Sequence, residues 1–215
     1  LFFLCALLII MPNPVLLALY LGAVFLAYAY SMPPLRLKAR SIFAMLSLML
    51  ILSIIPISFT YMVVSPVLDP LFIAFLCGQC MIIYGLIIPT EIRDHDWDKE
   101  MRINTMTVGL GVERAAFLGI VLLLVGLTLM GAAYIMQSVA IGQARLSVVL
   151  VAPVLSIAYV GRQYITIHSL LRANGGVGDM EGIIAVAAKN PMWITLVSQS
   201  IVIICLALLM MKIII

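Results

Sequence analysis

Charged side chains are scarce in this chain. Of its 215 residues only 10% are Asp, Glu, Lys or Arg, whereas 65% are apolar, and the mean hydropathy is +1.26. This composition excludes an ordinary soluble domain and indicates an integral membrane protein. The apolar runs also lack the alternation of polar and apolar residues that membrane barrel strands require. We therefore expect an all-α, polytopic transmembrane helical bundle.

A helix needs about 20 apolar residues to cross a bilayer. Windows of that length predict six complete spans, at residues 14–30, 41–62, 70–90, 115–137, 146–164 and 192–212. Residues 1–10 are wholly apolar but too short to cross alone, and they lack the basic region and small-residue cleavage site of a signal peptide. We interpret residues 1–215 as one transmembrane domain that continues a longer protein.

Basic residues are distributed unequally between the two faces that these spans create. Ten of the twelve Lys and Arg residues fall on one face, and only Arg145 and Lys212 fall on the other. Because Lys and Arg accumulate in cytoplasmic loops, we predict a multi-pass protein of the cell membrane with the polar loops 31–40, 91–114 and 165–191 in the cytoplasm. The net charge of +3 carries no nucleic-acid signal.

The loop at residues 91–100 holds five of the nine acidic residues. If the helix continues past Pro89, then Glu91, Asp94 and Asp98 share one face. Carboxylates one turn apart can address a diphosphate-bound Mg²⁺, and the lack of Cys or a second His nearby disfavours zinc. The alternative is a solvated loop stabilised by local ion pairs.

A basic segment precedes the next span. The proline pair at residues 33–34 predicts an extended segment, along which Arg36, Lys38 and Arg40 alternate with apolar residues. Such cations suit phosphate oxygens, and Tyr30 offers an aromatic face to a developing cation. The alternative is that these residues only anchor the helix end at the cytoplasmic interface.

These two segments resemble motifs of one family. Residues 30–38 resemble its YSxPPLRLK segment, and residues 94–99, followed by Thr105 and Leu110-Gly111, resemble the second aspartate-rich motif of the UbiA-type intramembrane prenyltransferase superfamily. The resemblance implies a nine-helix bundle of which about seven helices are present, the first two and part of the third being absent. The first aspartate-rich motif, of NDxxDxxxD type, would then lie upstream, and residues 1–215 alone would be inactive.

The resemblance also implies a reaction. A Mg²⁺-dependent enzyme of this kind transfers an isoprenyl group from an allylic polyprenyl diphosphate to a hydrophobic acceptor, here a lipid, a quinone precursor or a tetrapyrrole-like molecule. Its partners are these two substrates and membrane lipid. The implied metal ligands are Asp94 and Asp98, which with Tyr30 form the catalytic set. The implied substrate-binding residues are Arg36, Lys38, Lys99, Arg102 and Glu91.

One departure and two alternatives accompany this interpretation. Where the family commonly has Gly and a basic residue before the Thr, this chain has Arg102, Ile103 and Asn104. A transporter or channel with an acidic cytoplasmic loop would be favoured by charges in the middle of spans, and none is present. A CDP-alcohol phosphotransferase would need a DGxxAR-type glycine pattern, which is missing around residues 94–98.

Overall fold

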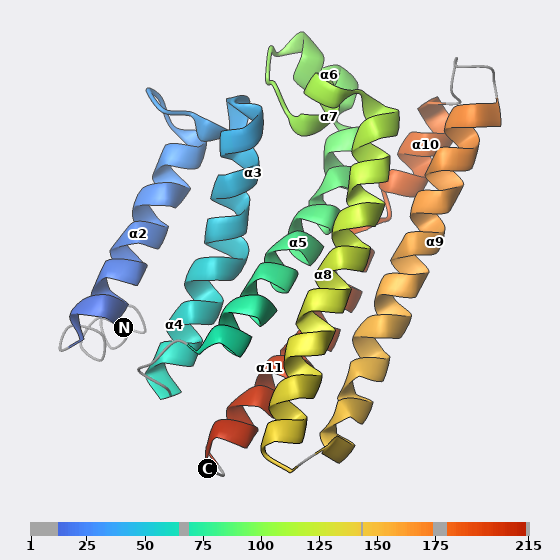
Figure 1. Cartoon of the computed structure of the whole chain (residues 1–215). Helices are drawn as coiled ribbons and strands as arrows, with labels where there is room; N and C mark the ends of the chain where they lie inside the picture. The colour runs from blue at the N-terminus through green and yellow to red at the C-terminus, as the bar shows by residue number, and fades with distance from the viewer. Residues whose placement is uncertain (1–12, 65–68, 143, 174–179, 214–215) are drawn as a thin grey trace.

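The computed structural model describes residues 13–64, 69–142, 144–173 and 180–213 (Figure 1). Within these residues every regular element is a helix, as predicted. The elements are α2 (Pro14–Ser31), η1 (Leu37–Ala39), α3 (Ser41–Met49), η2 (Leu50–Ile54), α4 (Ile55–Val64), α5 (Pro70–Arg93), α6 (His95–Glu100), α7 (Met106–Leu110), α8 (Val112–Ala140), η3 (Ala144–Leu150), α9 (Val151–Ala173), α10 (Met180–Ala187) and α11 (Asn190–Ile213).

Two helix starts follow directly from the sequence. Asn13 precedes Pro14, and its side-chain oxygen accepts hydrogen bonds from the first free N–H groups of α2, at 3.0 and 3.2 Å. Asp69 precedes Pro70 in the same way and accepts from the Phe72 N–H at 2.7 Å. A capping side chain followed by proline satisfies the unpaired N–H groups of a helix start and presets its backbone.

Five helical segments in the described part of the chain are long and apolar enough to cross a membrane. They are Pro14–Ser31, Ser41–Val63, Pro70–Arg93, Val112–Ala140 and Ser147–Arg172. They confirm the first five predicted spans and with them a multi-pass membrane protein. The second span consists of α3, the π-helical segment η2 and α4. The sixth predicted span lies within the helix α11 but is not among these five.

Helices α5 and α8 pack together at the centre of the bundle, with α2, α3 and α4 on one side and α9 and α10 on the other (Figure 1). Their backbones approach closely at Gly78 and Gly126. A Cβ atom built on Gly126 would lie 2.6 Å from the Gly78 carbonyl oxygen. Small residues permit such close packing between membrane helices. The central helix α5 therefore has a well-defined position, and it ends at the acidic loop.

Candidate active site

The basic segment and the acidic loop meet at one end of the bundle. Arg40 and Asn104 form an isolated parallel bridge, and the Ser41 N–H donates to the Asn104 carbonyl at 2.6 Å. The Ser41 hydroxyl also lies 3.0 Å from the Met106 sulfur. These contacts join two segments that are more than sixty residues apart in the chain, so the basic segment and the acidic loop lie next to each other.

The helix α5 does continue past Pro89, which was the condition for a shared face of the acids, and it ends at Arg93. Asp94 leaves the helical backbone, with φ −93° and ψ 4°, and α6 begins at the next residue. Helical hydrogen bonds nevertheless span the break, because the Asp94 N–H donates to the Thr90 carbonyl at 3.0 Å and the Asp98 N–H to the Asp94 carbonyl at 2.8 Å. Asp94 and Asp98 thus remain one turn apart.

Glu91 is directed into the protein. Its side chain is buried, and the Tyr84 hydroxyl donates to its Oε1 at 3.1 Å. The Thr107 N–H donates to its Oε2 at 3.3 Å, and the Thr107 hydroxyl donates to the Glu91 carbonyl at 3.1 Å. The face expected to carry three acids therefore presents two, because the third carboxylate connects α7 to α5.

Asp94 forms an ion pair with the residue before it. The Arg93 Nε lies 2.7 Å from Asp94 Oδ1, and the Arg93 Nη2 donates to Oδ2 at 3.0 Å. Both side chains are partly exposed, and exposed pairs typically contribute about 0–1 kcal/mol. A divalent cation can therefore compete with the guanidinium for this carboxylate.

The pKa of Asp98 is raised, first by burial of the carboxyl group and second by repulsion from Asp94. A hydrogen bond from Thr105 and the nearby charges of His95 and Lys38 offset part of this rise. Lys38 is the cation that the basic segment brings to the acidic loop. The two carboxylates repel each other in a partly buried place, and a bound cation would relieve that repulsion.

The basic segment is turned, which corrects the extended conformation that we expected. Arg36 adopts left-handed backbone angles, φ 38° and ψ 56°, and the 3-10 turn η1 follows it. The Arg36 N–H donates to the Met32 carbonyl at 2.9 Å, and the Arg40 N–H donates to the Leu37 carbonyl at 3.0 Å. A short connection without a partner strand satisfies its backbone groups locally. As a result Lys38 is half-buried, whereas Arg36 and Arg40 are exposed.

The remaining predicted residues lie around this centre. Tyr30, at the end of α2, is close enough to interact electrostatically with Glu91 and Asp98. Lys99 and Arg102 are exposed on the loop. Arg102 has φ 54°, a left-handed conformation that favours glycine. It lies in the segment before Thr105, in which members of the family that this chain resembles commonly have a glycine.

Several site residues had no role assigned from the sequence. The Thr105 and Thr107 hydroxyls lie 3.1 Å apart and connect Asp98 with Glu91. The Asn190 amide, at the start of α11, donates to the Thr90 hydroxyl and so connects α11 to the end of α5 that leads into the acidic loop. The only sequence signal for the threonines was the motif position of Thr105. For Asn190 there was none, because one hundred residues separate it from its partner.

The donor set fits Mg²⁺ held jointly by protein and substrate. Among the described residues no group of three or more His, Cys, Asp or Glu side chains could enclose a metal ion. Mg²⁺, however, is typically bound by one or two carboxylates together with water and phosphate oxygens. Asp94 and Asp98 supply two such carboxylates, one helical turn apart.

Comparison with known proteins shows the family to which this chain belongs. No match was found among curated proteins or among solved structures. The model of the UbiA prenyltransferase family matches residues 1–172. The match includes the basic segment, the acidic loop and the central helices α5 and α8. This protein is therefore a member of the UbiA prenyltransferase family.

Proposed function

We propose that this protein transfers an isoprenyl group from an allylic polyprenyl diphosphate to a lipid, a quinone precursor or a tetrapyrrole-like acceptor. Family membership supports prenyl transfer in the membrane. The observation that carries the assignment of the site is the contact between the basic segment and the acidic loop, through Arg40 and Ser41 on one side and Asn104 and Met106 on the other. The site lies at the cytoplasmic face in this proposal, because most basic residues are on that side.

Asp94 and Asp98 would hold Mg²⁺, which when bound neutralises charge on the diphosphate. Lys38 is placed beside Asp98 and donates to the diphosphate oxygens. Arg36 and Arg40 supply further cations from the same turn, and Lys99 and Arg102 supply them from the acidic loop. Cations fixed before the reaction stabilise the negative charge that develops on the leaving group.

The reaction breaks the bond between C1 of the isoprenyl chain and the diphosphate oxygen, and the bonding electrons leave with the diphosphate. The acceptor's nucleophilic atom then forms a bond to C1 and loses its proton. Tyr30 presents an aromatic ring that stabilises the allyl cation between these events. The surrounding apolar helices exclude water, which would otherwise capture the cation.

Glu91 acts in this proposal as a positioning residue and makes no direct contact with substrate. Both of its carboxylate oxygens accept hydrogen bonds inside the protein. It holds α7 against α5, and through the Thr107–Thr105 pair it holds the side chain that contacts Asp98. This role explains why an acidic residue is buried at the end of α5.

The test is transfer of a radiolabelled isoprenyl diphosphate by membranes that contain the full-length protein. Asp98→Asn is expected to lower Mg²⁺-dependent transfer by about 100-fold or more, the magnitude typical for loss of a group that stabilises the transition state. Asp96→Asn is the matched control, because Asp96 is exposed and pairs with His95 at the surface of the loop; it should retain activity. Normal turnover by Asp98→Asn would contradict the assignment.

A further inference from the structure

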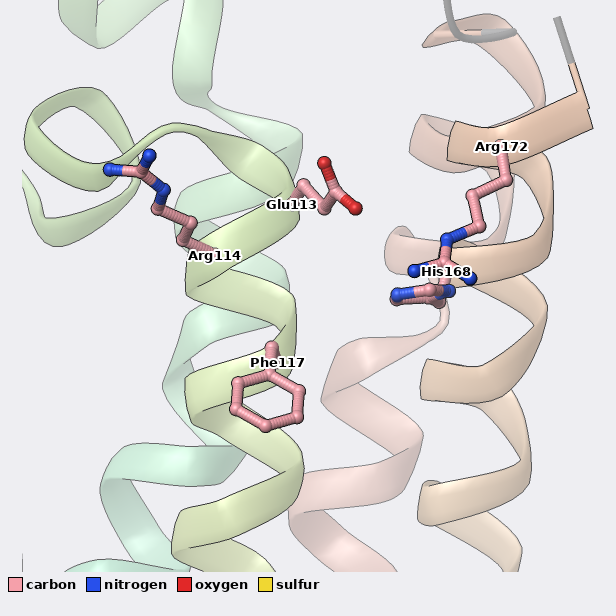
Figure 2. A pocket seen from close by; sticks show the side chains of 5 residues that line it. All are labelled: Glu113, Arg114, Phe117, His168 and Arg172. Carbon is pink, nitrogen blue, oxygen red and sulfur yellow. The ribbon is translucent and has the colours of Figure 1, made fainter. Parts of the chain in front are cut away.

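A second charged pocket lies between α8 and α9, apart from the carboxylate site. It has a volume of about 360 Å³ and is lined by Glu113, Arg114, Phe117, His168 and Arg172. Figure 2 shows Glu113 projecting from α8 toward α9, and His168 and Arg172 projecting from α9 into the gap. Arg114 projects away from α9. The gap is therefore bordered by a carboxylate on one helix and a guanidinium and an imidazole on the other.

These charges are not neutralised within the described part of the chain. The ion pairs found there join Arg93 to Asp94 and His95 to Asp96, and neither involves a side chain of the pocket. Glu113 and Arg172 are both exposed. Both helices are candidate membrane spans, and these residues lie at their polar ends. In a bilayer that these helices cross, the pocket would lie at the depth of the lipid headgroups.

An apolar surface continues from the pocket toward the membrane interior. On α8, Phe117 is 61% exposed and is followed at helical spacing by the exposed residues Val121 and Leu124. On α9, Ile165 precedes His168 by one turn and is 65% exposed. Gly161 precedes Ile165 by another turn, and a Cβ atom added to it would meet nothing within 4 Å.

Helices α8 and α9 are in direct contact behind this surface. A Cβ atom added to Gly119 of α8 would collide with the ring of Tyr164 on α9, and the Tyr164 side chain is fully buried. The space between the helices therefore does not lead into the bundle. We call the pocket together with the exposed apolar residues that follow it on both helices the outward-facing groove.

We propose that this groove binds a glycerophospholipid whose headgroup carries a phosphate and a primary ammonium group, as phosphatidylethanolamine does. Arg172 and His168 donate to the phosphate, which suits the planar guanidinium. Glu113 pairs with the ammonium and would repel a headgroup that carries negative charge alone. An acyl chain covers Phe117, Val121, Leu124 and Ile165. Basic pockets between membrane helices on the cytoplasmic side commonly bind phospholipid headgroups.

The experiment is native mass spectrometry of the purified full-length protein after equilibration with equal amounts of phosphatidylethanolamine and phosphatidylglycerol. The wild type should retain phosphatidylethanolamine in preference. Arg172→Gln should lower retention of both lipids about tenfold, as expected for loss of roughly 1.4 kcal/mol of binding free energy. Glu113→Gln should shift the retained ratio toward phosphatidylglycerol. Equal retention of the two lipids by the wild type would overturn the proposal.

Matched controls come from the same side of the bundle. Lys189→Gln and Glu181→Gln change exposed charges outside the pocket, so the retained ratio should stay that of the wild type. Glu113 is exposed and forms no ion pair with any residue that the structure describes, so its substitution leaves folding intact and tests the proposal even if Arg172→Gln fails to fold. Soluble glycerophosphoethanolamine should not displace the lipid at equal concentration; displacement would refute the role of the apolar stripe.

Discussion

At the scale of single residues, Asp98 has the clearest electrostatic signature of the site. Burial and the neighbouring Asp94 raise the pKa of its carboxyl group. Mg²⁺ binds the ionised carboxylate, so protons and metal compete for the same group. Lowering the pH through this raised pKa should weaken the apparent affinity for Mg²⁺ in the transfer assay. A Mg²⁺ requirement that stays constant across that range would contradict the assignment.

The same pKa shift has a consequence for stability without metal. Because the folded-state pKa of Asp98 lies above its unfolded value, its contribution to stability is present at low pH and is lost as the pH rises. Asp98→Asn should therefore unfold at a higher temperature than the wild type at neutral pH in a chelator. The difference should vanish at acidic pH. Thermal unfolding in detergent measures both, with Asp96→Asn as the variant that should show neither effect.

At the scale of helices, the buried carboxylate of Glu91 connects the short helix α7 to α5. Glu91→Ala would leave the Tyr84 hydroxyl and the Thr107 N–H without their partner, at a cost of about 1–3 kcal/mol for each buried group. We expect faster amide hydrogen exchange at residues 105–110 together with reduced prenyl transfer. Thr107→Val should reproduce part of this effect.

The matched control for Glu91→Ala and Thr107→Val is Thr128→Val. Thr128 also hydrogen-bonds through its hydroxyl, but to the Leu124 carbonyl on the exposed side of α8, so exchange in α7 should not change. A Glu91→Ala variant with normal exchange at residues 105–110 but impaired transfer would indicate that Glu91 contacts substrate and would refute the positioning role.

The contact between α5 and α8 depends on the absence of side chains. A Cβ atom on Gly126 would lie 2.6 Å from the Gly78 carbonyl oxygen and 2.8 Å from an Ile82 side-chain carbon. Gly126→Ala should therefore force the helices apart and destabilise the bundle by about 1–3 kcal/mol, measured by thermal unfolding. Gly131→Ala on the same helix meets nothing within 4 Å and should be neutral or slightly stabilising.

At the scale of the whole molecule, the distribution of charge predicts its orientation in the membrane. Single cysteines in a cysteine-free background can test this with a membrane-impermeant maleimide. Asp96→Cys, on the exposed acidic loop, should react in inverted vesicles and not in intact cells. Val63→Cys, at the other end of the second span, should show the reverse. The opposite pattern would place the candidate site outside the cell.

The sequence alone determined five of the six predicted membrane spans and the helix starts at Asn13 and Asp69. Each of these depends on local chemistry: a bilayer selects long apolar runs, and a cap acts on the turn that follows it. The sequence also predicted that Asp94 and Asp98 lie one helical turn apart, because helical spacing is a local property that the kink after Arg93 preserves.

Only the tertiary structure decided which partner each polar side chain has. Glu91 shares the sequence spacing of the other acids, yet packing of α7 against α5 turns it inward. Lys38 lies close enough to lower the pKa of Asp98 because the basic segment turns after Arg36 and meets the acidic loop at Asn104. Packing of α8 against α9 brings Glu113 and Arg172, which are far apart in the sequence, to the lining of one pocket. Hydropathy and spacing act along the chain, whereas burial and charge pairing depend on segments that meet only when the helices pack.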